Sequence, residues 1–264
     1  MMFQEFKSCN GSLGLGRSGS PSDPIRGMPL TGRDNRLRGY VFDLSTSCCV
    51  DGGFCLGMSD EQDSECVECL ASRIGRIGSS IYRASATDPV ASDELDASRG
   101  DSVIFRIEAV ALYSEGVQQQ LSQTAELLLK VGVRVFVAFP EPSSSDAGFL
   151  RSFRAALYVL EDQGIEVFFV GTLSQKLGRN LRSVLERSVS GLMVSPRVLG
   201  LGDKYGAYNP AKFETGVKML SEAIHEHRKV VVMEDVKTTW QRDVLQGIPF
   251  HAFSGSISGS QVIV

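Results

Sequence analysis

Acidic residues follow several of the apolar segments of this chain. Asp43 follows YVF, Glu141 follows VAFP, and Glu234 and Asp235 follow VVVM. In an open parallel α/β sheet the carboxyl ends of the strands meet at one edge, so these side chains are expected to converge. Convergent carboxylates suit Mg²⁺, a hard cation that prefers oxygen ligands. The alternative is that each acid is a solvated loop residue, and for any one of them taken alone that alternative is favoured.

Six cysteines lie in the first third of the chain. Four of them, Cys49, Cys55, Cys66 and Cys69, could supply the thiolates of a tetrahedral zinc site. The segment around the last two (DSECVECLASRIGRI) has a helical pattern, and in a helix cysteine often serves as a small buried apolar residue. Burial is therefore favoured over zinc, and free thiols are expected in a reducing compartment.

The elements that would position these residues alternate between apolar strands and amphipathic helices. Strands are expected at 39–44, 102–112, 133–139, 165–170, 191–195 and 229–235. Helices are expected at 62–83, 115–130, 147–162, 174–187 and 211–227.

This alternation predicts the fold class. The strands are apolar nearly throughout, which is typical of strands covered on both faces, and the helices carry apolar residues at helical spacing. Gly132 and Gly164 each stand immediately before a strand, where a helix ends on a left-handed residue. Right-handed crossovers between such elements give an α/β fold with a mostly parallel, Rossmann-like sheet between helical layers.

The order of four segments resembles the haloacid dehalogenase-like (HAD) superfamily. A strand leading into FDLST (42–46) is similar to the first motif of that family, Asp-x-Asp-x-Thr after apolar residues. Residues 156–186 look like its second-motif region, and 206–220 stand where the family has Lys-Pro and a helix. Residues 229–253 are similar to its fourth motif, a strand ending in an acidic pair and then a helix, Gly-Ile and another strand.

The resemblance implies roles for particular residues. The first Asp of the family is a nucleophile that forms an aspartyl-phosphate while Mg²⁺ neutralises phosphate charge. Carried over, Asp43 is the nucleophile and a metal ligand, and Asp235, together with Glu234, completes the metal site.

Several positions depart from the family's pattern. The general acid and base is replaced by Ser45, whose hydroxyl is a poor proton shuttle. The phosphate-binding Thr aligns with Gly171 and the Lys with Asn209. Together these changes predict weak or absent phosphatase activity. The nearest substitutes for binding phosphate are Thr172, Lys204 and Lys212.

The same alignment divides the chain into segments. Residues 1–38 are expected to be a flexible leader, because much of this stretch is rich in Gly, Ser, Pro and Arg. Residues 39–46 and 146–264 would form the HAD-like core. Residues 47–145 would be a large insertion after the first strand, either a cap or an extension of the sheet.

The composition narrows the classes of partner. A formal charge of −4 over 264 residues gives no strong signal for nucleic acid or an anionic membrane. No stretch approaches the roughly 20 continuous apolar residues of a membrane-spanning helix, so membrane insertion is not expected. The protein is expected to be intracellular, either cytoplasmic or organellar, with mitochondria as one alternative, and to have protein partners.

Three functions stay open at this point. The first is a catalytically degenerate HAD-like protein that acts as a structural or accessory subunit. The second is an active Mg²⁺-dependent phosphohydrolase with an aspartyl-phosphate mechanism. The third is a non-catalytic α/β protein that binds a small ligand.

Overall fold

A computed structural model describes residues 25–44, 60–86, 101–142, 146–173, 178–258 and 261–263. The strands are β1 (Ile25–Gly32), β2 (Leu37–Asp43), β3 (Ser102–Arg106), β4 (Arg134–Pro140), β5 (Glu166–Val170), β6 (Gly191–Val194), β7 (Val230–Met233), β8 (Ala252–Ser254) and β9 (Gln261–Ile263). The helices are α1 (Asp60–Ala86), α2 (Glu115–Leu129), α3 (Ala147–Asp162), α4 (Arg179–Ser188), α5 (Pro210–His225) and α6 (Thr239–Leu245).

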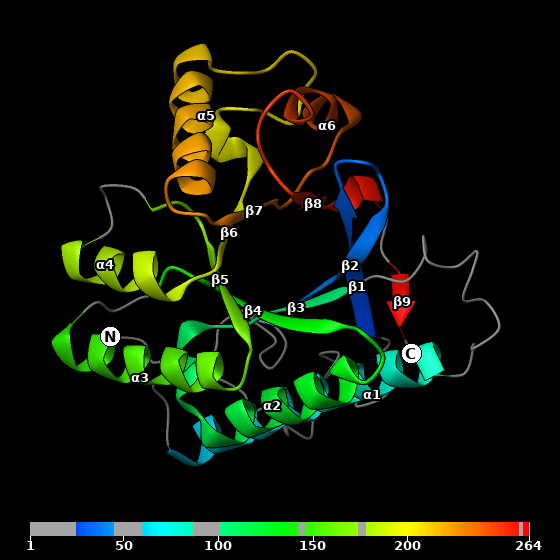
Figure 1. Cartoon of the computed structure of the whole chain (residues 1–264), viewed down its shortest axis with the longest axis vertical. Coiled ribbons are helices and arrows are strands. Elements are labelled where there is room, and N and C mark those ends of the chain that lie inside the picture. Colours follow the sequence, from blue (N-terminus) through cyan, green and yellow to red (C-terminus); the bar gives the residue numbers. More distant parts are fainter. Residues whose placement is uncertain are drawn as a thin grey trace, which may run out of the picture.

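Strands β1 to β8 form a closed barrel (Figure 1). From β2 to β8 each strand pairs in parallel with the next one in the chain. β1 lies between β8 and β2 and is antiparallel to both, so the sheet closes on itself. The short strand β9 pairs antiparallel with the first residues of β1. The open Rossmann-like sheet expected from the sequence is therefore wrong, although the parallel strands and their crossover helices are present.

The closing strand lies inside the segment that the sequence assigns to the leader. β1 reads IRGMPLTG, in which two glycines and a proline weaken the pattern of a strand. Its register nevertheless places Met28 opposite Val41 and Leu30 opposite both Gly39 and Ser254. Burial of Leu30 and Val41, with Met28 partly buried beside them, fixes the strand.

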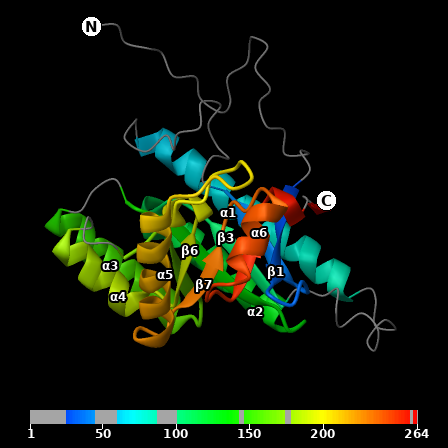
Figure 2. The same cartoon turned by 90° about the horizontal axis from the view of Figure 1, so that it is seen from above.

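The segment expected to be inserted after the first strand, residues 47–145, contributes two strands to the barrel. Residues 102–106 and 134–140 are β3 and β4, and they follow β2 as consecutive barrel strands. Helix α1 packs beside α2 on the outside (Figures 1 and 2).

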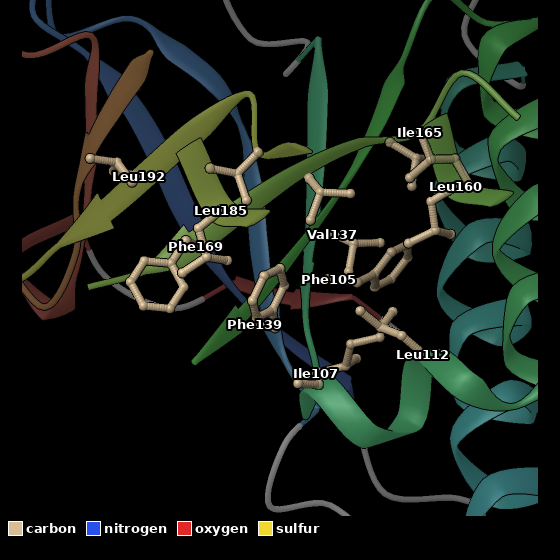
Figure 3. Packing of buried hydrophobic residues seen from close by; sticks show 14 of the residues in the cluster. Phe105, Ile107, Leu112, Val137, Phe139, Leu160, Ile165, Phe169, Leu185 and Leu192 are labelled. Atoms are coloured by element: carbon tan, nitrogen blue, oxygen red, sulfur yellow. The ribbon is translucent and has the colours of Figure 1, made fainter. Parts of the chain in front are cut away.

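Alternate strand residues divide between two apolar clusters. Inside the barrel lie Leu30, Val41, Ile104, Phe136, Ala138, Phe168, Met193, Val232 and Ala252. Outside, residues such as Phe105, Val137 and Phe169 pack against the helices, as Figure 3 shows for this outer cluster. Filling both faces explains why the strands are apolar nearly throughout.

Gly39 allows β2 and β3 to approach closely at the start of the barrel. Its φ is +151°, and a Cβ there would lie 1.8 Å from the carbonyl oxygen of Ser102. A side chain at this position would push the two strands apart.

Among the described residues, none of the helices has the length and apolar character needed to cross a membrane.

Candidate functional site

Strand alternation carries four polar side chains into the barrel at its C-terminal end. Asp43 stands two residues after the inward-facing Val41, and Arg106 two residues after Ile104. In the same way, Glu234 stands two residues after the inward-facing Val232, and Ser254 two residues after Ala252 on the next strand. The C-terminal end is where barrels of this kind hold their active sites, which makes this polar layer the candidate site.

Arg106 reaches across the barrel from β3 to the end of β7. Its Nη1 donates to Oε2 of Glu234 at 3.0 Å, and its Nε lies 3.8 Å from Oδ2 of Asp43. The second distance is an ion pair but too long for a hydrogen bond. Nε is buried and has no hydrogen-bond partner among the described residues. Within the described parts of the chain, one strong donor at the centre of the site therefore has no acceptor.

Ser254 supplies a second unused donor. Its hydroxyl is buried without a hydrogen-bond partner among the described residues, and the residue is only 1% exposed. The register pairs Met233 with Phe253, so the next residues, Glu234 and Ser254, are neighbours. Buried polar atoms without partners are rare in proteins, and a bound ligand is one reason for them.

Burial and neighbouring acids shift the protonation of this layer. The pKa of Glu234 is raised to about 6, chiefly because burial penalises the charged carboxylate, and Asp235 and Asp43 raise it further. Arg106 opposes this shift. Burial likewise raises the pKa of Glu108, which stands just beyond β3. The site can therefore take up a proton near neutral pH.

The segment after β7 is built rigidly. Asp235 has a left-handed φ of +58°, and its carboxylate pairs with Nζ of Lys237 at 3.2 Å. Thr238 then starts α6 with a capping box: its hydroxyl accepts from the N–H of Gln241, whose side chain accepts from the N–H of Thr238. The Gln241 amide also donates to the carbonyl of Gly202 at 3.1 Å, tying this segment to the loop after β6.

Two aromatic side chains lie on that loop and on α6. The rings of Tyr205 and Trp240 are 6.2 Å apart, and Tyr205 is 89% exposed. Tyr208, farther along the same loop, is 53% exposed. Exposed aromatic rings beside a polar site offer a flat surface on which a planar group can stack.

A divalent cation does not fit the described donors. Asp43 and Glu234 are the carboxylates that pair with Arg106, and its guanidinium already bridges them. Within the described parts of the chain no cluster of three His, Cys, Asp or Glu side chains could hold a metal ion. Arg106 supplies the positive charge at the position where the sequence predicts Mg²⁺.

The structure separates the other expected site residues. Asp235 follows the same strand as Glu234 but pairs with Lys237. Thr172 lies just after β5 and is half-buried, whereas Lys204, between η3 (Pro196–Leu199) and α5, and Lys212, in the first turn of α5, are exposed.

Other expected positions fall outside the described side chains, with one exception. Ser45, Cys49 and Cys55 lie outside the described residues, and the side chain of Cys66 is not described. Cys69 is a free, exposed thiol, although the sequence favours burial.

Sequence reasoning missed Arg106 and Ser254. Arg106 is the single charge within SVIFR, and a lone charge in an otherwise apolar strand was the available signal. Ser254 carries no such signal, because its importance comes from the barrel closing beside it.

Solved structures share this barrel. No protein-family profile and no curated protein matches the sequence. An EAL enzyme, Bd1971, solved with cAMP and cyclic-di-GMP, matches with a TM-score of 0.64 and 12% identity over 90% of this chain and 61% of its own length. The EAL domain of Mycobacterium smegmatis DcpA matches with 0.57 and 15%, over 91% of each chain. Klebsiella pneumoniae BlrP1, solved with manganese and cyclic-di-GMP, matches with 0.60 and 15%, over 91% of this chain and 56% of its own.

These matches establish the fold. The chain has the closed barrel of the EAL structures, and it spans about 61% of the length of Bd1971. The HAD resemblance is wrong, and the three functions that depended on it or on an open α/β sheet fall with it. The likeness arose because a strand, an acidic pair and a helix recur in both folds.

Proposed function

We propose that this protein binds a cyclic dinucleotide at the C-terminal end of its barrel. The observation that carries the proposal is a pair of buried donors in the inward-facing layer, Nε of Arg106 and Oγ of Ser254, which have no hydrogen-bond partner within the part of the chain that the structure describes. Both donors need an acceptor, and a phosphodiester oxygen is one. Bd1971 and BlrP1, which share the fold, were solved with cyclic-di-GMP, and this supports the choice of ligand.

The two acids that pair with Arg106 affect how the site binds a phosphate group. Asp43 and Glu234 hold the guanidinium in position, so its side chain is already ordered when a ligand arrives. An arginine fork also matches phosphate oxygens better than a point charge does. The acidic neighbours oppose an anion, so we expect binding to be accompanied by proton uptake at Glu234.

A pair of aromatic rings, the exposed Tyr205 and the half-buried Trp240, supports a nucleotide rather than a simple phosphate ester. Tyr205 and Trp240 lie on the loop after β6 and on α6, close in sequence and space to the segment that follows Glu234. Stacking of a base on an aromatic side chain contributes about 1–3 kcal/mol. A dinucleotide can engage the guanidinium and this surface together.

The role of a metal here differs from that expected from sequence. BlrP1 was solved in complexes of cyclic-di-GMP with manganese and with calcium. Among the described residues of the present chain no third His, Cys, Asp or Glu joins Asp43 and Glu234, and Arg106 pairs with both carboxylates. We therefore expect that Mg²⁺ is not needed for ligand binding.

Calorimetric titration with cyclic-di-GMP tests the proposal. We expect one molecule to bind per chain, with the same affinity in EDTA and in Mg²⁺. Arg106→Gln is expected to weaken binding at least tenfold, since a charge-assisted hydrogen bond is worth roughly 1.5–3 kcal/mol. Ser254→Ala is expected to weaken it less, by about threefold to tenfold.

The matched control is Arg197→Gln, because Arg197 is an exposed arginine on the loop after β6 that also pairs with an acid, Asp203 at 2.9 Å. Its affinity should stay within twofold of the parent. Equal binding by Arg106→Gln, or no binding at millimolar ligand, would refute the proposal. Appearance of linear dinucleotide in Mg²⁺ or Mn²⁺ would instead favour a phosphodiesterase.

A further inference from the structure

A cavity of about 500 Å³ opens at the opposite, N-terminal end of the barrel. It is lined by the first residues of five strands and by the hairpin between β1 and β2. It shares none of its lining residues with the layer of Asp43, Arg106, Glu234 and Ser254. Cavities of roughly 300–1,000 Å³ that combine apolar walls with a few polar groups are the usual binding sites for small molecules. The five first residues are Ser102, Arg134, Glu166, Val230 and Ala252.

The walls of this cavity are apolar and partly aromatic. Phe136 and Phe168 come from neighbouring strands, and their ring centroids are 5.2 Å apart. Phe250, just before β8, also lines the cavity, while Ile104 and Val232 contribute aliphatic surface. Three phenyl rings around one cavity favour a flat aromatic body over a branched or strongly polar one.

Among the described residues, the rim carries one cation without a carboxylate partner, Arg33, and one acid without a cationic partner, Asp101, whose carboxylate accepts from the hydroxyl of Ser102. Arg38 pairs with Asp34 at 2.8 Å, and Arg134 lies 3.8 Å from Glu166. Arg33 differs, because no carboxylate of the described residues lies within 4.0 Å of its guanidinium.

The guanidinium of Arg33 is nevertheless held in position. Its Nη2 donates to the carbonyl of Gln246 at 2.7 Å, and the group lies over the ring of Phe250, 5.2 Å from its centroid. A cation fixed in this way at the edge of an aromatic cavity is preorganised to receive an anion.

His251 adds a second donor beside Arg33. The backbone N–H of Val231 donates to Nδ1 of His251 at 3.0 Å, so this nitrogen carries no proton. The proton of the neutral ring is therefore on Nε2. Burial lowers the pKa of His251, and the nearby charge of Arg33 lowers it further, which keeps the ring neutral at pH 7. Arg33 is therefore the group of this rim, among the described residues, that offers a positive charge to an anion.

We propose that this N-terminal cavity is a second ligand site, which binds a small aromatic monoanion. The aromatic body lies between Phe136, Phe168 and Phe250, and the anionic group accepts from Arg33 and from Nε2 of His251. The site is separate from the C-terminal layer, so it can be occupied whether or not a dinucleotide binds there.

The fluorescence of 1-anilinonaphthalene-8-sulfonate, an aromatic monoanion, tests this site on the folded full chain. We expect saturable binding of one probe molecule per chain. Arg33→Glu should weaken binding at least tenfold, because it replaces the unneutralised cation with an acid. Ala252→Phe, which places a phenyl ring into the cavity, should do the same. Near-ultraviolet circular dichroism of each variant checks that the fold is kept.

The control is Arg36→Glu, since Arg36 belongs to the same hairpin, is 70% exposed and does not line the cavity. It makes the same change of charge and should leave probe affinity within twofold. Cyclic-di-GMP should not displace the probe, and Arg106→Gln should bind it normally. Parent-like binding by Arg33→Glu, equal weakening by Arg36→Glu, or displacement by cyclic-di-GMP would each overturn the proposal.

Discussion

Glu234 makes a testable contribution to stability. Its pKa is raised from 4.5 to about 6 by burial and by the acids beside it. Its side chain is only 13% exposed, so solvent screens the shift little. A difference of about 1.5 pKa units corresponds to roughly 2 kcal/mol. The folded state favours the protonated carboxyl by about that amount.

The direction in which stability changes with pH follows from the raised pKa of Glu234. Because the pKa is higher in the folded state, the stabilisation is fully present below pH 4.5 and is lost as the pH rises through about 6. Glu234→Gln cannot titrate. The unfolding free energy of this variant relative to the parent should therefore rise by about 2 kcal/mol between pH 4.5 and pH 7.5.

Urea unfolding of both proteins at half-unit steps of pH measures this difference. Glu226→Gln is the matched control, because Glu226 is exposed at the end of α5 and the charge removed is the same. The reasoning would be refuted if the difference between Glu234→Gln and the parent changed by less than about 0.5 kcal/mol over this range, or if the control changed as much.

Three further substitutions test the barrel itself. Gly39→Ala should lower the unfolding free energy by about 3 kcal/mol or more, whereas Gly132→Ala, also at positive φ but with open space around it, should cost only about 1–2 kcal/mol in the same chemical denaturation. Lys229→Met should cost about 2–3 kcal/mol by thermal unfolding, because the buried ammonium donates to two carbonyls at the end of α4 that would lose their partner. Thr238→Ala should cost about 1 kcal/mol through loss of the capping box, and restoration by Ser at this position would separate capping from packing.

Much of the local structure was predictable from sequence. Helices expected at 115–130 and 147–162 are α2 and α3, and strands expected at 133–139 and 165–170 are β4 and β5, each within about a residue. These elements are specified by their own apolar spacing, which a single sequence displays. What the sequence did not specify was whether the sheet is open or closed.

The barrel closes through β1, and the residues of this segment give only a weak strand pattern. The strand is short of β-branched residues and contains Pro29, so its burial comes from partners on β2 and β8 rather than from its own propensity. The same limit applies to the site. Asp43 and Glu234 were found from strand ends, but Arg106 joins them only because β3 and β7 stand opposite each other in a closed ring.

The position of β1 also bears on how the chain is made in the cell. The β1–β2 hairpin is synthesised before β3 to β7, yet Leu30 must pair with Ser254, which is made only after all of them. At translation rates of roughly 5–20 residues per second, the nascent hairpin waits for many seconds with one edge unsatisfied. A stalled or truncated product that lacks β8 would therefore expose that edge, and such products are expected to aggregate or to be captured by chaperones.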